Sequence, residues 1–199
     1  MIPDLDFKHL FYILFASGIT NNIALNYFLG MCPFLSLSKN IPAAFGMGVA
    51  VTAVILPTAA VNWLINHFLL EPFQLEIFQF MVFILTIAGM VQLVEIVIDQ
   101  FFPRLQEAFG LFLPLIAVNT AILGVSIFML FRQYSFFETL FFALGSGIGW
   151  TIAIVTLAGI RNQLVFSNPE KNLGDIGITL LIAGFMAMAF AGFKGIASL

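Results

Sequence analysis

The chain has 199 residues, of which 61% are hydrophobic and only 9% charged, and its mean hydropathy is +1.09. A soluble domain carries roughly 25% charged residues, and no soluble fold of this length could hide so much apolar surface. The small net charge of −3 lacks the basic face that nucleic acid requires. The composition therefore indicates an integral membrane protein in contact with lipid and excludes a nucleic-acid partner.

Six apolar stretches are long enough to cross a membrane, because a spanning helix needs about 20 mostly apolar residues. They predict an all-α fold with transmembrane helices at roughly 10–36, 43–66, 77–101, 109–131, 136–160 and 176–195. Residues 1–199 then form a single membrane domain. The N-terminal stretch is acidic and lacks a small-residue cleavage site, so we interpret it as a retained first helix.

The segment from Arg161 to Asp175 is the only sizeable aqueous loop in this scheme. No loop is long enough for a nucleotide-binding fold, and no glycine-rich phosphate motif follows a strand, so we expect no NAD or flavin on this chain itself. Basic residues are the usual marker of cytoplasmic loops. One side would hold Lys8, Arg132 and Lys194, and the other Lys39, Arg104, Arg161 and Lys171. The count favours both termini outside the cytoplasm.

Three blocks of the first half resemble blocks of the second half in the same order. Residues 32–38 align with 120–126, residues 44–52 with 143–151, and residues 85–90 with 180–185, at offsets of 88, 99 and 95. Three helices per half is an odd number, so the second half must enter the membrane from the opposite side. The sequence therefore predicts an inverted 3+3 repeat of residues 10–101 and 109–195.

In inverted repeats the functional site lies near the midplane, where corresponding helices are broken. Gly, Pro and small polar residues suit such breaks, since the freed backbone groups need partners inside the protein. We expect breaks in the first helix at Gly30 and Pro33 and in the fourth at Asn119 and Gly124, with the two helices facing each other. The alternative is a pair of proline-kinked helices with ordinary packing roles.

Cys32 is the only cysteine, so the chain can form no internal disulfide. A lone buried cysteine is usually a small packing residue. Cys32, however, lies beside the expected break, where a thiolate would be a soft metal ligand.

Glu95 has apolar neighbours on both sides within the third predicted helix, and Asp99 follows one turn later. A carboxylate at membrane depth is costly unless it is paired, protonated or hydrated. Glu95 is therefore a candidate for an ion or proton site; its alternative role is an interfacial charge.

Residues 21–34 (NNIALNYFLGMCPF) strongly resemble the signature of a family of membrane redox subunits. The family includes the E-type subunit of the sodium-translocating NADH:quinone oxidoreductase and the A-type subunit of the Rnf ferredoxin:NAD oxidoreductase. The resemblance spans nearly the whole chain, through residues 91–99, 101–103, 110–119, 145–153 and 157–161. Residues 132–136 (RQYSF) and 147–150 (GIGW) look more like the sodium-pump protein.

The resemblance implies a multi-pass protein of the bacterial inner membrane with a homologous six-helix subunit (the D-type in the pump) as its partner. Flavin- and iron–sulfur-bearing subunits would complete the complex. The two homologous subunits would share an iron or 2Fe–2S centre bound by cysteines of their broken helices. Cys32 matches one family ligand, whereas Thr120 replaces the cysteine of the family motif Val-Asn-Cys-Ala-Ile. A hydroxyl is a poor ligand for iron, so this replacement argues against a normal centre.

Two classes of function follow. The first is a subunit of a redox-driven sodium pump that helps to carry electrons across the membrane, with Cys32 as metal ligand and Glu95 near the ion path; the Rnf-type complex is its close variant. The second is a transporter-like or structural membrane subunit without a metal.

Overall fold

A computed structural model describes residues 7–73, 76–101, 116, 119–164 and 170–194. The described residues are helical or lie in short turns, and none of them forms a β-strand. The elements in chain order are α1 (Phe7–Phe15), η1 (Ala16–Thr20), α2 (Ile23–Tyr27), α3 (Met31–Leu37), α4 (Ile41–Ile65), η2 (Asn66–Leu70), η3 (Glu76–Phe78), α5 (Gln79–Phe101), α8 (Thr120–Phe131), α9 (Phe136–Leu164) and α10 (Glu170–Lys194).

Four helical stretches are long and apolar enough to span a membrane: Ile41–Leu70, Gln79–Val97, Phe136–Leu164 and Gly174–Gly192. They coincide with four of the six predicted spans. The first predicted span, 10–36, is a series of short helical segments and not one helix. Of the fourth, 109–131, the structure describes residue 116 and the stretch from 119, which contains the shorter apolar helix Thr120–Phe131.

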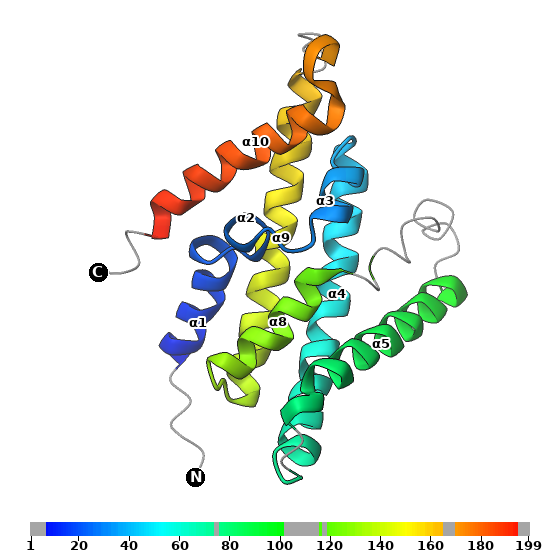
Figure 1. Cartoon of the computed structure of the whole chain (residues 1–199), viewed down its shortest axis with the longest axis vertical. Coiled ribbons are helices and arrows are strands. Elements are labelled where there is room, and N and C mark those ends of the chain that lie inside the picture. Colours follow the sequence, from blue (N-terminus) through cyan, green and yellow to red (C-terminus); the bar gives the residue numbers. More distant parts are fainter. Residues whose placement is uncertain (1–6, 74–75, 102–115, 117–118, 165–169, 195–199) are drawn as a thin grey trace.

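Helices α4 and α9 run antiparallel through the centre of the molecule and contribute about half of the buried residues of its core (Figure 1). Thr52 and Thr151 meet between them, with their Oγ1 atoms 3.3 Å apart. Each hydroxyl donates to a glycine carbonyl one turn earlier in its own helix, Thr52 to Gly48 and Thr151 to Gly147, both at 2.8 Å. Small residues at such a crossing allow the backbones to approach closely.

In the contact between α4 and α9, a glycine of each helix faces a threonine of the other. A Cβ on Gly147 would lie 2.7 Å from Thr52 Cγ2, and a Cβ on Gly48 would collide with the side chain of Thr151. The two halves of this contact are the residues that the sequence blocks 44–52 and 143–151 align with each other. A twofold relation produces such exchanged pairs. The complete repeat of 10–101 and 109–195 stays a prediction, because residues 102–115 lie outside the described part of the chain.

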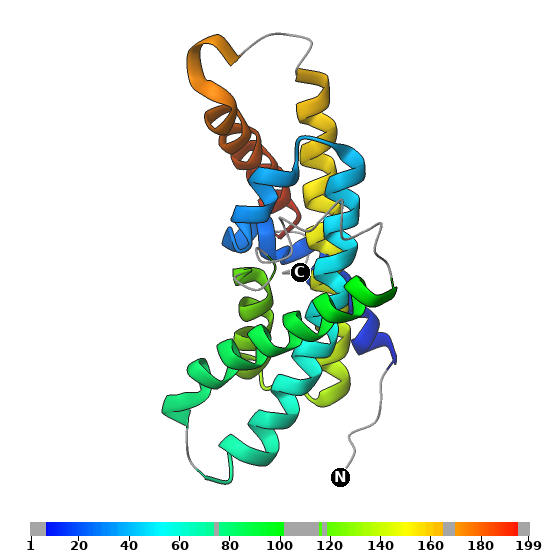
Figure 2. The same cartoon turned by 90° about the vertical axis from the view of Figure 1, so that its right-hand side faces the viewer.

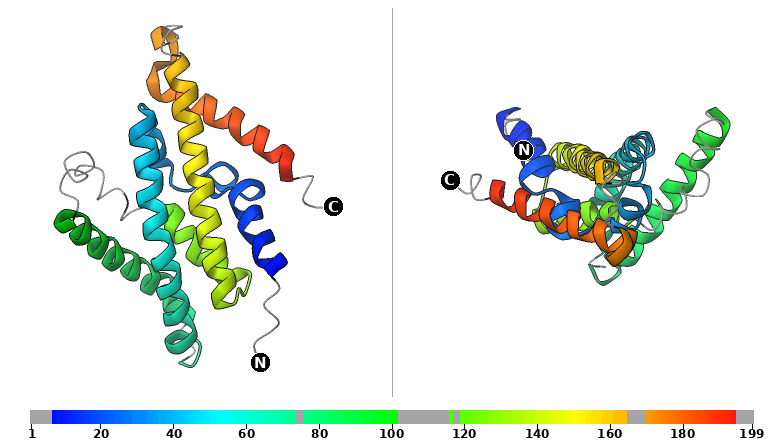
Figure 3. Two further views of the ribbon diagram at one scale, coloured as in Figure 1. Left: turned by 180° about the vertical axis from the view of Figure 1, so that it is seen from behind. Right: turned by 90° about the horizontal axis from the view of Figure 1, so that it is seen from above.

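Contacts at the two ends of the molecule show which of the turns between helices lie at the same end. At one end His9 Nδ1 lies 3.2 Å from Glu138 Oε1, and Trp63 Nε1 donates to the Tyr134 carbonyl at 3.0 Å. At the other end Lys39 Nζ lies 2.9 Å from Asp175 Oδ2. The start of α1 therefore lies with the α8–α9 turn, opposite the α3–α4 turn and the start of α10 (Figure 3).

Helices α5 and α10 diverge from the central pair (Figures 1 and 2). Only 17% of the apolar stretch of each is buried inside the chain, against 44% for α4 and 56% for α9. The exposed faces carry large apolar side chains such as Leu85, Phe185 and Met188. A surface of this kind is stable only against lipid or another membrane subunit, which supports the multi-pass membrane interpretation.

Candidate functional site

The first predicted span is interrupted around residues 21–22 and again around 28–30. The π-helical segment η1 ends at Thr20, α2 ends at Tyr27 before the left-handed Phe28 (φ 54°), and α3 begins after the left-handed Gly30 (φ 76°). Such π segments recur at functional sites. The structure thus interrupts the first span where the sequence concentrates Asn and Gly, and it places Gly30 directly at a break.

Asn22 supplies the hydrogen bonds that the first interruption requires. Its Oδ1 accepts from the backbone N–H groups of Ala24 and Leu25 at 3.0 and 3.4 Å, which caps α2. Its Nδ2 donates to the carbonyls of Gly18 and Gly149 at 3.0 and 2.7 Å. Because buried backbone groups need partners, this fully buried amide makes the interruption tolerable and attaches it to α9.

Asn119 plays the same capping role in the second half. Its Oδ1 accepts from the N–H of Ala121 at 3.0 Å, and its own backbone is extended, so α8 begins at Thr120. Asn22-Ile23-Ala24 and Asn119-Thr120-Ala121 are thus equivalent helix starts. In both, the residue after the capping asparagine is the first of its helix, Ile23 in α2 and Thr120 in α8, whereas the alignment of 32–38 with 120–126 stays a prediction.

Gly30 connects the second interruption of the first span to the start of α8. Its N–H donates to Thr120 Oγ1 at 2.7 Å. A Cβ at Gly30 would lie 2.6 Å from Asn119 Oδ1 and 2.8 Å from Trp150 Nε1, so both the positive φ and the crowding require glycine. The start of α3 at Gly30 therefore touches the start of α8 at Thr120. Cys32 follows two residues later in the first turn of α3, and both Cys32 and Thr120 are exposed on this chain.

Two of the expected break residues do not lie at breaks. Pro33 lies in the first turn of α3, where its missing N–H costs no helical hydrogen bond. Gly124 lies inside α8, which is continuous from Thr120 to Phe131. A Cβ at Gly124 would come within 2.5 Å of Leu29 Cδ1, so its role is to let α8 approach the α2–α3 connection.

The side chains around the Gly30–Thr120 contact do not supply enough metal ligands for an iron centre. Cys32 is an accessible soft ligand, but Thr120 offers a neutral hydroxyl that already accepts the Gly30 N–H. Nearby, Asn119 Nδ2 and Trp150 Nε1 are buried without partners among the described residues, and both are donors that cannot bind a metal. No group of three or more His, Cys, Asp or Glu side chains forms a metal site within the described residues. Cys32 fits as one ligand; Thr120 does not fit.

Glu95 lies near the end of the apolar stretch Gln79–Val97 of α5 and is partly exposed. Its carboxylate has no hydrogen bond or ion pair with the other described residues. The side chain of Asp99 lies outside the described part of the chain. The structure therefore places Gly30 against Thr120, with Cys32 two residues further along the chain, and shows no contact between Glu95 and these residues.

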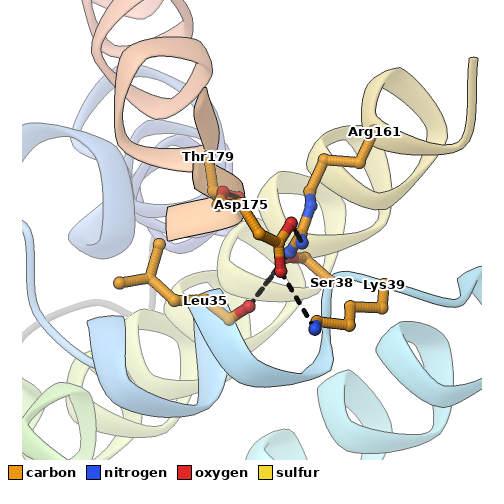
Figure 4. Close-up of polar contacts among 6 residues, drawn as sticks. All are labelled: Leu35, Ser38, Lys39, Arg161, Asp175 and Thr179. Atoms are coloured by element: carbon orange, nitrogen blue, oxygen red, sulfur yellow. Dashed lines mark hydrogen bonds and ion pairs between the residues drawn. The ribbon is translucent and has the colours of Figure 1, made fainter. Parts of the chain in front are cut away.

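A charged cluster that the sequence did not reveal lies at the other end of α3, where the buried Arg161 meets the more exposed Asp175 and Lys39 (Figure 4). Arg161, on α9, donates from Nη1 to the Leu35 carbonyl at 3.1 Å and to Ser38 Oγ at 2.6 Å. Its Nη2 pairs with Asp175 of α10, which also pairs with Lys39. The guanidinium thus holds the C-terminal end of the helix that carries Cys32.

The model of the Rnf-Nqr subunit membrane proteins matches residues 10–197, almost the whole chain. The chain belongs to the Rnf-Nqr family. It is 45% identical over 186 residues to the A-type subunit of the Na+-translocating ferredoxin:NAD+ oxidoreductase complex of Acetobacterium woodii, covering 94% of this chain and 97% of the relative. It is 42% identical over 200 residues to the E-type subunit of the Na+-translocating NADH-quinone reductase of Hahella chejuensis, covering 96% and 98%. The helix interruptions around Gly30 and Asn119 are thus features of an Rnf-Nqr protein.

Proposed function

We propose that this chain is a membrane subunit of a sodium-translocating redox complex, specifically an NADH:quinone reductase, and that it works only within that complex. The observation that carries the proposal is its similarity, over nearly the full length of both proteins, to subunits of two such complexes. A chain that is almost entirely membrane-embedded has no domain for NADH, so the redox substrates must meet other subunits.

The two relatives belong to complexes with different electron donors and acceptors, and their identities to this chain are nearly equal. Residues 132–136 and 147–150 favour the quinone reductase. An affinity tag on this chain, expressed in its own host, allows the intact complex to be purified. We expect sodium-stimulated quinone reduction by NADH and sodium uptake into proteoliposomes. Ferredoxin-dependent NAD reduction by the same preparation would assign the chain to the Rnf-type complex instead.

The contact between the two helix starts supports a role in electron transfer with a homologous partner subunit. Cys32 and Thr120 are exposed on the isolated chain although they lie at the crowded junction around Gly30. A second membrane subunit packed against this junction would bury both. We propose that Cys32 is one ligand of an iron centre shared with that partner, and that the Thr120 hydroxyl acts as a structural acceptor and not as a ligand.

We also propose an orientation with both termini outside the cytoplasm of a bacterial inner membrane. The grouping of the ends supports the loop alternation on which this orientation rests, since Lys39 and Arg161 lie together at the end opposite His9. The count of basic residues assumed the same arrangement, in which successive loops lie on alternate sides of the membrane. A C-terminal fusion to a reporter active only in the cytoplasm should be inactive; strong activity would reverse the assignment.

A further inference from the structure

Polar side chains follow one face of α4 towards its C-terminal end and into the first residue of η2. Thr58, Asn62 and Asn66 are spaced four residues apart, so they lie on one face of the helix. Thr58 and Asn62 are completely buried, and Asn66 is 6% exposed. Polar side chains in the interior of a membrane protein are costly and commonly mark the path of an ion.

This polar face leads into a cavity between the ends of α4, α5 and α8. The cavity has a volume of about 750 Å³, and its polar lining includes Asn66, Glu71 and Gln79. Gln79 Nε2 donates to Asn66 Oδ1 at 2.8 Å, and Asn66 Nδ2 donates to Glu71 Oε1 at 3.0 Å. Glu71, half-exposed, is the one carboxylate among the described lining residues. His67, which also lines the cavity, lies 3.1 Å from Glu71 Oε2 through its Nδ1, so the one carboxylate at the mouth already has two partners.

One turn further in, two buried oxygen atoms have no partner. Asn62 Nδ2 donates to Ser126 Oγ at 2.7 Å, and that hydroxyl donates to the Ile122 carbonyl at 3.2 Å. This arrangement leaves Asn62 Oδ1 and Thr58 Oγ1 unpaired among the described residues. A buried acceptor without a donor is unfavourable, and in native proteins it commonly indicates a water molecule or an ion.

We propose that Asn62 Oδ1 and Thr58 Oγ1 are ligands of a buried sodium site that begins one helical turn beyond Asn66, the residue of this polar face that lines the cavity. Amide and hydroxyl oxygens suit hard cations. Because both ligands are neutral, the site favours a monovalent ion over a divalent one, whose charge would stay uncompensated in a low dielectric. Water molecules would complete the coordination. The proposal rests on the proposed sodium-translocating function and gives that function a binding site on this chain.

The test measures turnover of the intact complex against sodium concentration. Asn62→Leu replaces the amide by a side chain of the same branched heavy-atom skeleton, and Thr58→Val replaces the hydroxyl at nearly constant shape. Loss of one oxygen ligand should raise the half-saturating sodium concentration about tenfold. Asn62→Asp, assayed at alkaline pH, places a carboxylate at the same position and should lower it. Misfolding cannot produce this opposite change.

Thr156→Val is the matched control, because Thr156 is exposed and donates only to the Ile152 carbonyl of its own helix. It should leave the sodium dependence unchanged. Opposite shifts in Asn62→Leu and Asn62→Asp, with none in Thr156→Val, support the site. Wild-type sodium dependence in all Asn62 and Thr58 variants would overturn it and would identify the unpaired oxygens as water-binding atoms, while the proposed function would stand. A wild-type complex that turns over independently of sodium would overturn both.

Discussion

Replacement of Gly30 by alanine should destabilise the subunit, because two separate costs add at this position. Alanine in the left-handed conformation at φ 76° costs about 1–2 kcal/mol. The new Cβ would also lie 2.6 Å from Asn119 Oδ1 and 2.8 Å from Trp150 Nε1, an overpacking that costs about 1–3 kcal/mol. We therefore expect a loss of about 2–5 kcal/mol in the free energy of unfolding.

The assay is the heating of purified complex, followed by the fraction of this subunit that stays assembled. A loss of this size should lower the midpoint by at least about 4 °C. Gly89→Ala is the control, since Gly89 lies inside α5 with no atom within 4 Å of an added Cβ, and alanine there should be neutral or stabilising. If Gly30→Ala and Gly89→Ala melt alike, the tight junction between the two helix starts does not exist.

Three further predictions concern the charged and metal-binding residues. Thr120→Cys should raise the iron content of the purified complex, and Cys32→Ala should remove whatever iron is present. If iron analysis finds neither change, Cys32 is a packing residue and not a metal ligand. Arg161→Ala should lower the free energy of unfolding by about 2–3 kcal/mol, because buried hydrogen bonds from a charged group are lost. Lys39→Ala, which removes an exposed ion pair, should change it by no more than about 1 kcal/mol. Equal melting of the two variants would contradict this ranking. Glu95→Gln should leave assembly intact and change the dependence of turnover on sodium, and unchanged sodium kinetics would make Glu95 an interfacial charge.

The sequence predicted some of the helix breaks and caps, which depend on local residue types, but not the contacts between distant segments. Gly30 and Asn119 could be predicted as break residues because a left-handed position and a helix cap each favour particular residue types. Pro33 and Gly124 carry the same general signal, but the first residues of a helix tolerate proline and a close helix contact also requires glycine. The residue type alone does not separate these roles.

The charged and polar clusters could not be predicted for a different reason. Arg161 lies at the end of an apolar stretch, where a charge is normally interfacial, and its pairing with Asp175 and Ser38 depends on how three helices meet. Asn62 and Thr58 carry no charge, so each of them taken alone resembles an ordinary helix-packing residue. Their four-residue spacing within the apolar span 43–66 was the available signal.

The pairing of α4 with α9 has a consequence for how the protein is made. Thr52 and Thr151 are in contact but lie 99 residues apart in the chain. At about 5–20 residues per second, the ribosome needs roughly 5–20 s to deliver the second helix after the first. During that interval α4 is already synthesised while its main packing partner does not yet exist, and its threonines and asparagines face either lipid or the insertion machinery. Biogenesis of this subunit should therefore depend on a membrane insertase that shelters a polar helix until its partner arrives.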